Sequence, residues 1–170
     1  MATTYTLISS NVLSSSAASV TFSSIPATYT DLVVRYSARS TDTSSYETFV
    51  RLEMNGGSAT HSSTVLRAQG GSVGSLRSTS LVVAGYIPTA TATSDTYGNA
   101  EFYLPNYLST IKKTGSHYGV QENNNASNAS IAITALLVDV TSAVTDLLLK
   151  PNAGNFVSTS SFYLYGISNA

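Results

Sequence analysis

Apolar and polar residues alternate with a period of two along most of the chain, whereas helical spacing is scarce. Successive side chains of a strand point to opposite faces, so this alternation predicts half-buried β-strands. In segment 31–39 the predicted inner side carries Leu32, Val34, Tyr36 and Ala38. In segment 46–54 it carries Tyr46, Thr48, Val50, Leu52 and Met54, with Glu47, Phe49, Arg51 and Glu53 on the outer side.

Clusters of Gly, Pro, Asn and Ser bound the alternating segments and predict turns between them. Further strands are predicted near 4–8, 19–23, 63–68, 79–87, 98–104, 116–121, 130–138, 144–150 and 161–167. Segment 140–150 also fits one short helix, since Val140, Val144 and Leu147 have helical spacing. If segment 31–39 pairs with 46–54, outward Arg and Glu side chains face each other across the two strands.

About ten short strands with turn signals between them predict an all-β fold, an antiparallel β-sandwich of the jelly-roll type. Residues 70–78 and 88–96 are expected to be connections at the ends of the sandwich. Nothing in the composition divides the chain, so residues 1–170 are predicted to form one domain, with residues 1–10 as an N-terminal arm.

Serine is unusually common, and nearly half of residues 9–26 are serine. The chain has 29 Ser and 22 Thr but only 10% charged residues, against roughly 25% in a typical soluble domain. Within the serine-rich stretch, Val20 and Phe22 share one face of a predicted strand. We therefore interpret the stretch as part of the folded domain, its hydroxyls forming a solvent face, and not as a linker.

The formal net charge is −1, and the eight basic residues are spread along the chain. Nucleic-acid binders normally carry a basic patch or stripe, so no nucleic-acid partner is expected. Absence of cysteine excludes disulfides and thiolate chemistry. No signal peptide and no apolar run of the roughly 18 residues that span a membrane is visible, so no membrane partner is expected.

One motif resembles a catalytic site. Residues 70–74 have the spacing G-x-S-x-G of a nucleophile elbow, and Asp95 and His117 follow Ser72 in the order of a catalytic triad. Such an elbow lies between a strand and a helix, but no helical pattern follows here. We interpret 70–74 as a flexible turn and expect no enzymatic activity.

The two histidines, His61 and His117, lie far apart in sequence, without a partner at metal-ligand spacing. Both are expected in loops or on the surface, and neither a metal nor a cofactor is predicted. Eleven tyrosines and no tryptophan are present. The strand tyrosines are expected to lie partly in the core, whereas glycan contact is left open for Tyr86, Tyr97, Tyr107 and Tyr118.

Three stretches resemble small virion structural proteins of tailed bacteriophages of aquatic bacteria, cyanophages among them. They are an opening stretch from Tyr5 to about residue 34, the sequence GNAEFYLPNY from Gly98, and NFVSTSSFYLYGI from Asn155. The resemblance implies a structural part of a virion with an all-β, jelly-roll-like fold. It assigns no catalytic or ligand-binding residue.

A capsid decoration (cement) protein is the function that this resemblance and the low charge lead us to expect. It would form a homo-oligomer, a trimer by expectation, and would stabilise the head by bridging subunits of the major capsid protein. The alternative is a tail fibre or receptor-binding module that contacts host surface glycan. The predicted interface is the N-terminal arm, with the residues Thr3, Thr4, Tyr5, Thr6, Leu7 and Ile8, because a terminal strand can add to a neighbour's sheet edge.

Overall fold

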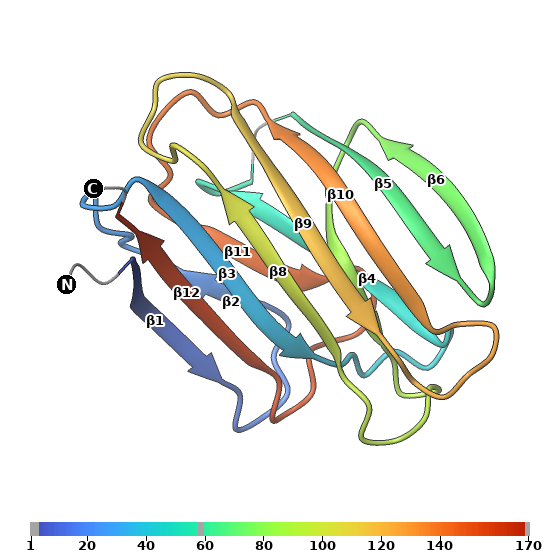
Figure 1. Cartoon of the computed structure of the whole chain (residues 1–170). Coiled ribbons are helices and arrows are strands. Elements are labelled where there is room, and N and C mark those ends of the chain that lie inside the picture. The colour runs from blue at the N-terminus through green and yellow to red at the C-terminus, as the bar shows by residue number, and fades with distance from the viewer. Residues whose placement is uncertain (1–3, 58–59, 169–170) are drawn as a thin grey trace.

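The computed structural model, which describes residues 4–57 and 60–168, consists of two antiparallel β-sheets, as expected from the alternation (Figure 1). The larger sheet has the strand order β1-β12-β3-β8-β9-β10-β5-β6, and the smaller has the order β2-β11-β4-β7. In the larger sheet the strands are β1 (Tyr5–Val12), β12 (Ser161–Ile167), β3 (Asp31–Ala38), β8 (Gly98–Leu104), β9 (Lys113–Gln121), β10 (Ser130–Val138), β5 (His61–Gln69) and β6 (Ser72–Ser78). In the smaller sheet they are β2 (Val20–Phe22), β11 (Leu147–Pro151), β4 (Glu47–Met54) and β7 (Val82–Pro88). The all-β fold class is confirmed.

The strand order is that of a jelly roll with two inserted hairpins. Without β5, β6, β9 and β10, two four-stranded sheets remain, β1-β12-β3-β8 and β2-β11-β4-β7. Consecutive strands of this set alternate between the sheets in its first half, as in an eight-stranded jelly roll. One inserted hairpin, β5–β6, lies between β4 and β7, and the other, β9–β10, lies between β8 and β11. Both hairpins join the same end of the larger sheet.

The main core fills the space between the two sheets, and most of the residues predicted to point inward are buried, whereas Tyr46, also predicted inward, is exposed. Leu32, Val34 and Tyr36 of β3 are buried, as are Val50, Leu52 and Met54 of β4. The serine-rich stretch contributes β2, whose Val20 and Phe22 are buried while Thr21 is exposed. Segment 9–26 therefore does contain a strand of the folded domain.

One local prediction is wrong, and two possibilities that the sequence left open are excluded. Residues 70–78 are not a connection, since Ser72–Ser78 form β6. The helical alternative for 140–150 fails because Leu147–Pro151 form β11. Segments 31–39 and 46–54 do not pair, because β3 lies between β12 and β8, whereas β4 lies between β11 and β7 in the other sheet. The charge pairs still cross strands: Arg35 binds Glu101 on β8, and Lys150 on β11 binds Glu53.

The inserted hairpins curve around the edge of the smaller sheet. A second, smaller core consists of Val65, Val83, Tyr86 and Ala132, with Phe49 and Leu81 packed against it. Phe49 and Tyr86 meet edge-to-face, with ring centroids 6.5 Å apart. Phe49 and Glu47 of β4 are therefore half-buried, not solvent-facing as the alternation predicted, because a second layer covers their side of the strand.

Candidate interaction surface

The strands β9, β10, β5 and β6 form a four-stranded part of the larger sheet that we call the extension (Figure 1). Along β10, every second residue from Ser130 to Val138 is buried and every residue between is exposed. The exposed set includes Ile131, Ile133 and Leu137, so large apolar side chains face outward from β10 as well as inward. These side chains define the outer face of the extension.

Neighbouring strands continue this apolar surface. The strand register places Ile133 of β10 between Leu66 of β5 and Tyr118 of β9, and places Ala68 between Ile131 and Val73. Exposure is 55% for both Ile133 and Leu66, and 75% for Val73. Contiguous exposed apolar patches of this kind mark interaction sites on soluble proteins.

Charge is almost absent from the outer face of the extension. Among the outward residues of its four strands, Arg77 on β6 is the single charged side chain. Elsewhere the outer surfaces carry ion pairs, such as Arg35–Glu101 at 2.7 Å on the other half of the same sheet. Depletion of charge in an apolar surface is typical of the centre of a protein–protein interface.

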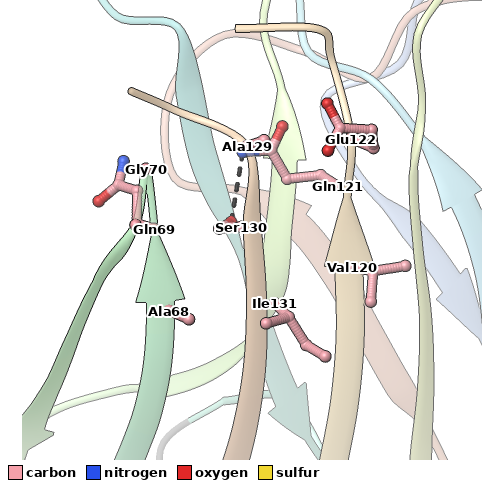
Figure 2. Close-up of a pocket in the computed structure, with 10 residues that line it drawn as sticks. Ala68, Gln69, Gly70, Val120, Gln121, Glu122, Ala129, Ser130 and Ile131 are labelled. Carbon is pink, nitrogen blue, oxygen red and sulfur yellow. Dashed lines mark hydrogen bonds between the residues drawn. The ribbon is translucent and has the colours of Figure 1, made fainter. Parts of the chain in front are cut away.

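A shallow hollow lies at the end of this face, where the strands meet the β5–β6 and β9–β10 turns (Figure 2). Its volume is about 300 Å³, and its lining residues are Ala68, Gln69, Gly70, Gly71, Val120, Gln121, Glu122, Ala129, Ser130 and Ile131. Glu122 is the only ionisable group in this lining. The hollow can seat one side chain of a docked partner beside Val120 and Ile131.

A polar network holds the extension against the smaller sheet. Glu47, at the start of β4, forms an ion pair with Arg67 of β5. Its two carboxylate oxygens also accept hydrogen bonds from Nε2 of Gln69 at 3.1 Å and from Nε2 of Gln121 at 2.8 Å. The Arg67 guanidinium stacks 3.9 Å from the centre of the Tyr86 ring. One carboxylate thus ties both inserted hairpins to β4.

His117 lies inside the protein, not on the surface or in a loop as predicted. It is 1% exposed on the inner face of β9, and neither ring nitrogen has a hydrogen-bond partner among the described residues. Burial lowers the pKa of His117 to about 4, because the charged imidazolium loses its hydration. His61 on β5 is also buried, at 5% exposure, so the prediction is wrong for both histidines.

Glycine makes the room for His117. A Cβ at Gly85 of β7 would lie 2.6 Å from Nε2 of His117 and 2.3 Å from Oη of Tyr36. The φ of Gly85 is +110°, which side-chain-bearing residues rarely adopt. Tyr36 in turn donates its hydroxyl to the carbonyl of Ala84, and burial raises its pKa. The two rings therefore share a pocket that exists because β7 has a glycine there.

The residues of the catalytic motif do not come together. Ser72 begins the exposed edge strand β6, whereas His117 points inward from β9, three strands away across the sheet. Strands about 4.8 Å apart separate them by roughly 14 Å across the sheet, and a four-residue offset in register adds roughly 14 Å along the strands. Asp95 is an exposed loop residue between β7 and β8. Among the described residues, no group of three His, Asp or Glu side chains could hold a metal ion.

The predicted interface residues lie in an edge strand of the sheet. Tyr5, Thr6, Leu7 and Ile8 belong to β1, which pairs with β12 of the same chain. Thr4 is exposed just before this strand, and Thr3 lies outside the described residues. Ile8 packs against the main core, whereas Tyr5 and Leu7 are exposed. A contact with a neighbouring subunit through these residues stays a prediction.

The tyrosines left open for glycan contact differ in exposure. Tyr86 and Tyr107 are buried, so their rings are not available to a ligand on the surface. Tyr97 is half-buried, with its hydroxyl 2.6 Å from Oγ1 of Thr159. Tyr118 is 53% exposed and belongs to the outer face of the extension.

The part of the chain with assigned structure holds no helix long and apolar enough to cross a membrane.

No family model matches the chain, and no curated protein does. Among solved structures, the chain is similar to a protein of Bacteroides vulgatus provisionally described as a pore-forming toxin, with 6% identity and a TM-score of 0.16. That alignment covers 83% of this chain and 54% of the other.

Proposed function

We propose that the protein is a non-enzymatic structural component of a bacteriophage virion, and that it decorates the capsid by docking the outer face of the extension on the major capsid protein. The observation that carries the proposal is the uncharged apolar surface around Ile133. Exposed apolar patches of this kind usually mark the binding site of a partner. The jelly-roll fold and the three stretches that resemble virion proteins support the same assignment.

The mechanism of stabilisation is the burial of apolar area between the extension and the shell. Each docked copy removes Ile131, Ile133 and Leu66 from water, and the removal stabilises by about 25 cal/mol per Å² of apolar surface. The hollow beside Val120 and Ile131 takes one side chain of the capsid subunit. No metal, cofactor or reaction is needed for this role.

A charge in the centre of the outer face tests the proposal. We expect Ile133→Lys to reduce binding to particles that lack the protein by about tenfold or more, since central interface positions carry most of the binding energy. The fold should persist, because the Ile133 side chain is already half in solvent. Co-sedimentation of the purified variant with particles measures this.

Thr21→Lys is the matched control, because Thr21 is an exposed strand residue of the smaller sheet. It adds the same charge far from the extension and should bind particles as the unchanged protein does. Equal binding by the Ile133→Lys and Thr21→Lys variants would show that the outer face of the extension does not dock on the particle.

The tail-fibre alternative rests on Tyr118, an exposed aromatic ring on the same face of β9 as Val120, which lines the hollow. Sugars bind to surfaces that combine an apolar ring with a polar group. Binding of the protein to purified host polysaccharide, with loss on Tyr118→Ala and no binding to heads, would replace the decoration proposal with this one.

A further inference from the structure

The larger sheet ends in two edge strands, β1 and β6, and they differ in how they are protected. In β1 the pairing with β12 shifts between Leu7 and Ser9, a bulge of the kind that protects an edge from further pairing. β6 pairs with β5 without a shift from Ser72 to Ser78 and contains no proline. All its residues are exposed except the half-buried Ser78, so nothing in the described chain covers this edge.

The turn before β6 fixes which backbone groups of β6 point outward. Gly70 and Gly71 connect β5 to β6 with φ values of 52° and 84°, which are typical of a type I′ two-residue hairpin. The flanking residues of such a hairpin, here Gln69 and Ser72, form a hydrogen-bonded pair, and hydrogen-bonded pairs then alternate along the strands. The N–H and C=O groups that point away from β5 are therefore those of Val73, Ser75 and Arg77.

We propose that a second copy of this chain adds to this edge, so that the two β6 strands pair antiparallel around a two-fold axis at Ser75. In this register Ser75 lies opposite the partner's Ser75, and Val73 lies opposite the partner's Arg77. Every outward N–H and C=O of the three residues then has a partner, because the same three residues form the hydrogen-bonded pairs of the new ladder. The edge is thus complementary to itself.

Side chains and charges fit the same register. Leu76 comes to lie opposite the partner's Gly74, and a Cβ at Gly74 would have nothing within 4 Å, so there is room for the leucine. Arg77 is the one charged residue of β6. The two copies of Arg77 are offset by four residues, about 14 Å, which exceeds the roughly 8 Å over which exposed charges interact at physiological salt.

Dimerisation at β6 would enlarge the apolar surface that the outer face of the extension presents to a partner. Pairing at β6 joins two larger sheets edge to edge and sets their apolar outer faces side by side, without covering either. The contact is isologous and closes at two copies, whereas a trimer needs a head-to-tail contact such as β1 against β6. The trimer expected from the sequence and the dimer inferred here are therefore distinguished by mass.

Sedimentation equilibrium over roughly a hundredfold range of protein concentration tests the dimer, since a single added strand gives a small and weak interface. We expect the mass to rise from 17.8 kDa to twice that value with concentration. A mass of 17.8 kDa throughout, or of three times that value, would overturn the inference while leaving the docking proposal untouched.

A proline at Ser75 tests the edge itself. Its ring would replace an outward N–H, so Ser75→Pro should abolish the mass increase without breaking the β5–β6 ladder. Ser75→Ala keeps the N–H and is the control, expected to dimerise as the unchanged chain does. If the Ser75→Pro variant still dimerises, β6 is not the contact.

Charges at Val73 test the register without relying on proline. Val73→Glu places a carboxylate opposite the partner's Arg77 twice in each dimer, and should tighten dimerisation by roughly threefold to tenfold. Val73→Lys should weaken it by a similar factor. If Val73→Glu and Val73→Lys change the dimerisation affinity in the same direction, the Ser75-centred register is contradicted. Both variants should unfold at the same temperature as the unchanged chain, because Val73 lies at the exposed β6 edge.

Discussion

His117 is a buried titratable side chain whose neutral form the fold requires. It is almost fully enclosed, and its ring shares a pocket with Tyr36 under Gly85. Since the pocket offers no described hydrogen-bond partner to either ring nitrogen, a proton on the imidazole would remain poorly solvated. The protein should therefore lose stability when the solution becomes acidic enough to charge this residue.

We expect the free energy of unfolding to fall as the pH is lowered from 6.5 to 4. The unfolded chain protonates His117 near pH 6.5 and the folded chain near 4, so the unfolded state binds the extra proton in this window. The contribution of neutral His117 to the free energy of unfolding is fully present above pH 6.5. Its complete loss at low pH lowers the free energy of unfolding by about 3 kcal/mol. Urea unfolding of the unchanged protein and of His117→Gln at several pH values measures it. The variant should show a flatter profile, and equal slopes would contradict the burial argument.

At the scale of elements, Glu47 decides how firmly the extension is held. Its carboxylate is the shared acceptor for β5, through Arg67 and Gln69, and for β9, through Gln121. Both partners of the ion pair are mostly buried, with side-chain exposures of 14% for Arg67 and 12% for Glu47. Removal of one partner of such a pair leaves an uncompensated charge in a poorly hydrated site.

Glu47→Ala is therefore expected to destabilise the protein by about 3 kcal/mol. The loss should be local as well as global, because β5 and β9 lose their common anchor to β4 while the main core is unchanged. Hydrogen exchange should rise in β5 and β9 more than in β3 and β12. Glu53→Ala, which removes an ion-pair partner with greater exposure on the same strand, is the control and should cost less than about 1 kcal/mol. Equal effects of the two variants would contradict the anchoring role.

The strands that the sequence predicts are those whose apolar residues alternate along the chain. Along β4 and most of β12, buried positions alternate with half-buried ones, and β12 places Phe162 and Leu164 inward. In β3 the outward Val33 is buried as well. β6 was missed because it is exposed on both faces and so has no apolar alternation. The local signal that could have found it is the Gly70-Gly71 pair, which predicts a two-residue hairpin between neighbouring strands.

Pairing and layering depend on contacts far apart in sequence, which alternation does not encode. The period-two pattern predicts a face for Glu47 and Phe49 but not the second layer that covers that face. For His61 and His117, the residue type suggested a surface position, whereas both positions have the inward parity of their strands. For Ile131 and Ile133, the residue type suggests a buried position, but both have the outward parity of β10 and are exposed.

The whole molecule combines a jelly-roll sandwich with a sheet extension that presents two kinds of surface. The outer face of the extension is apolar and nearly uncharged, and β6 offers an open edge of backbone hydrogen-bonding groups. The face fits a broad protein partner, and the edge fits a second copy of the chain. Ile133→Lys tests docking and Ser75→Pro tests self-association, whereas Val73 belongs to both surfaces.

A density map of the virion at a resolution that separates β-strands tests whether the protein docks on the capsid. We expect many copies on the head, with β9, β10 and β5 of each copy turned toward the capsid shell and Ile133 at the contact. Density for the chain at the tail, or on the head with the outer face of the extension open to solvent, would contradict it.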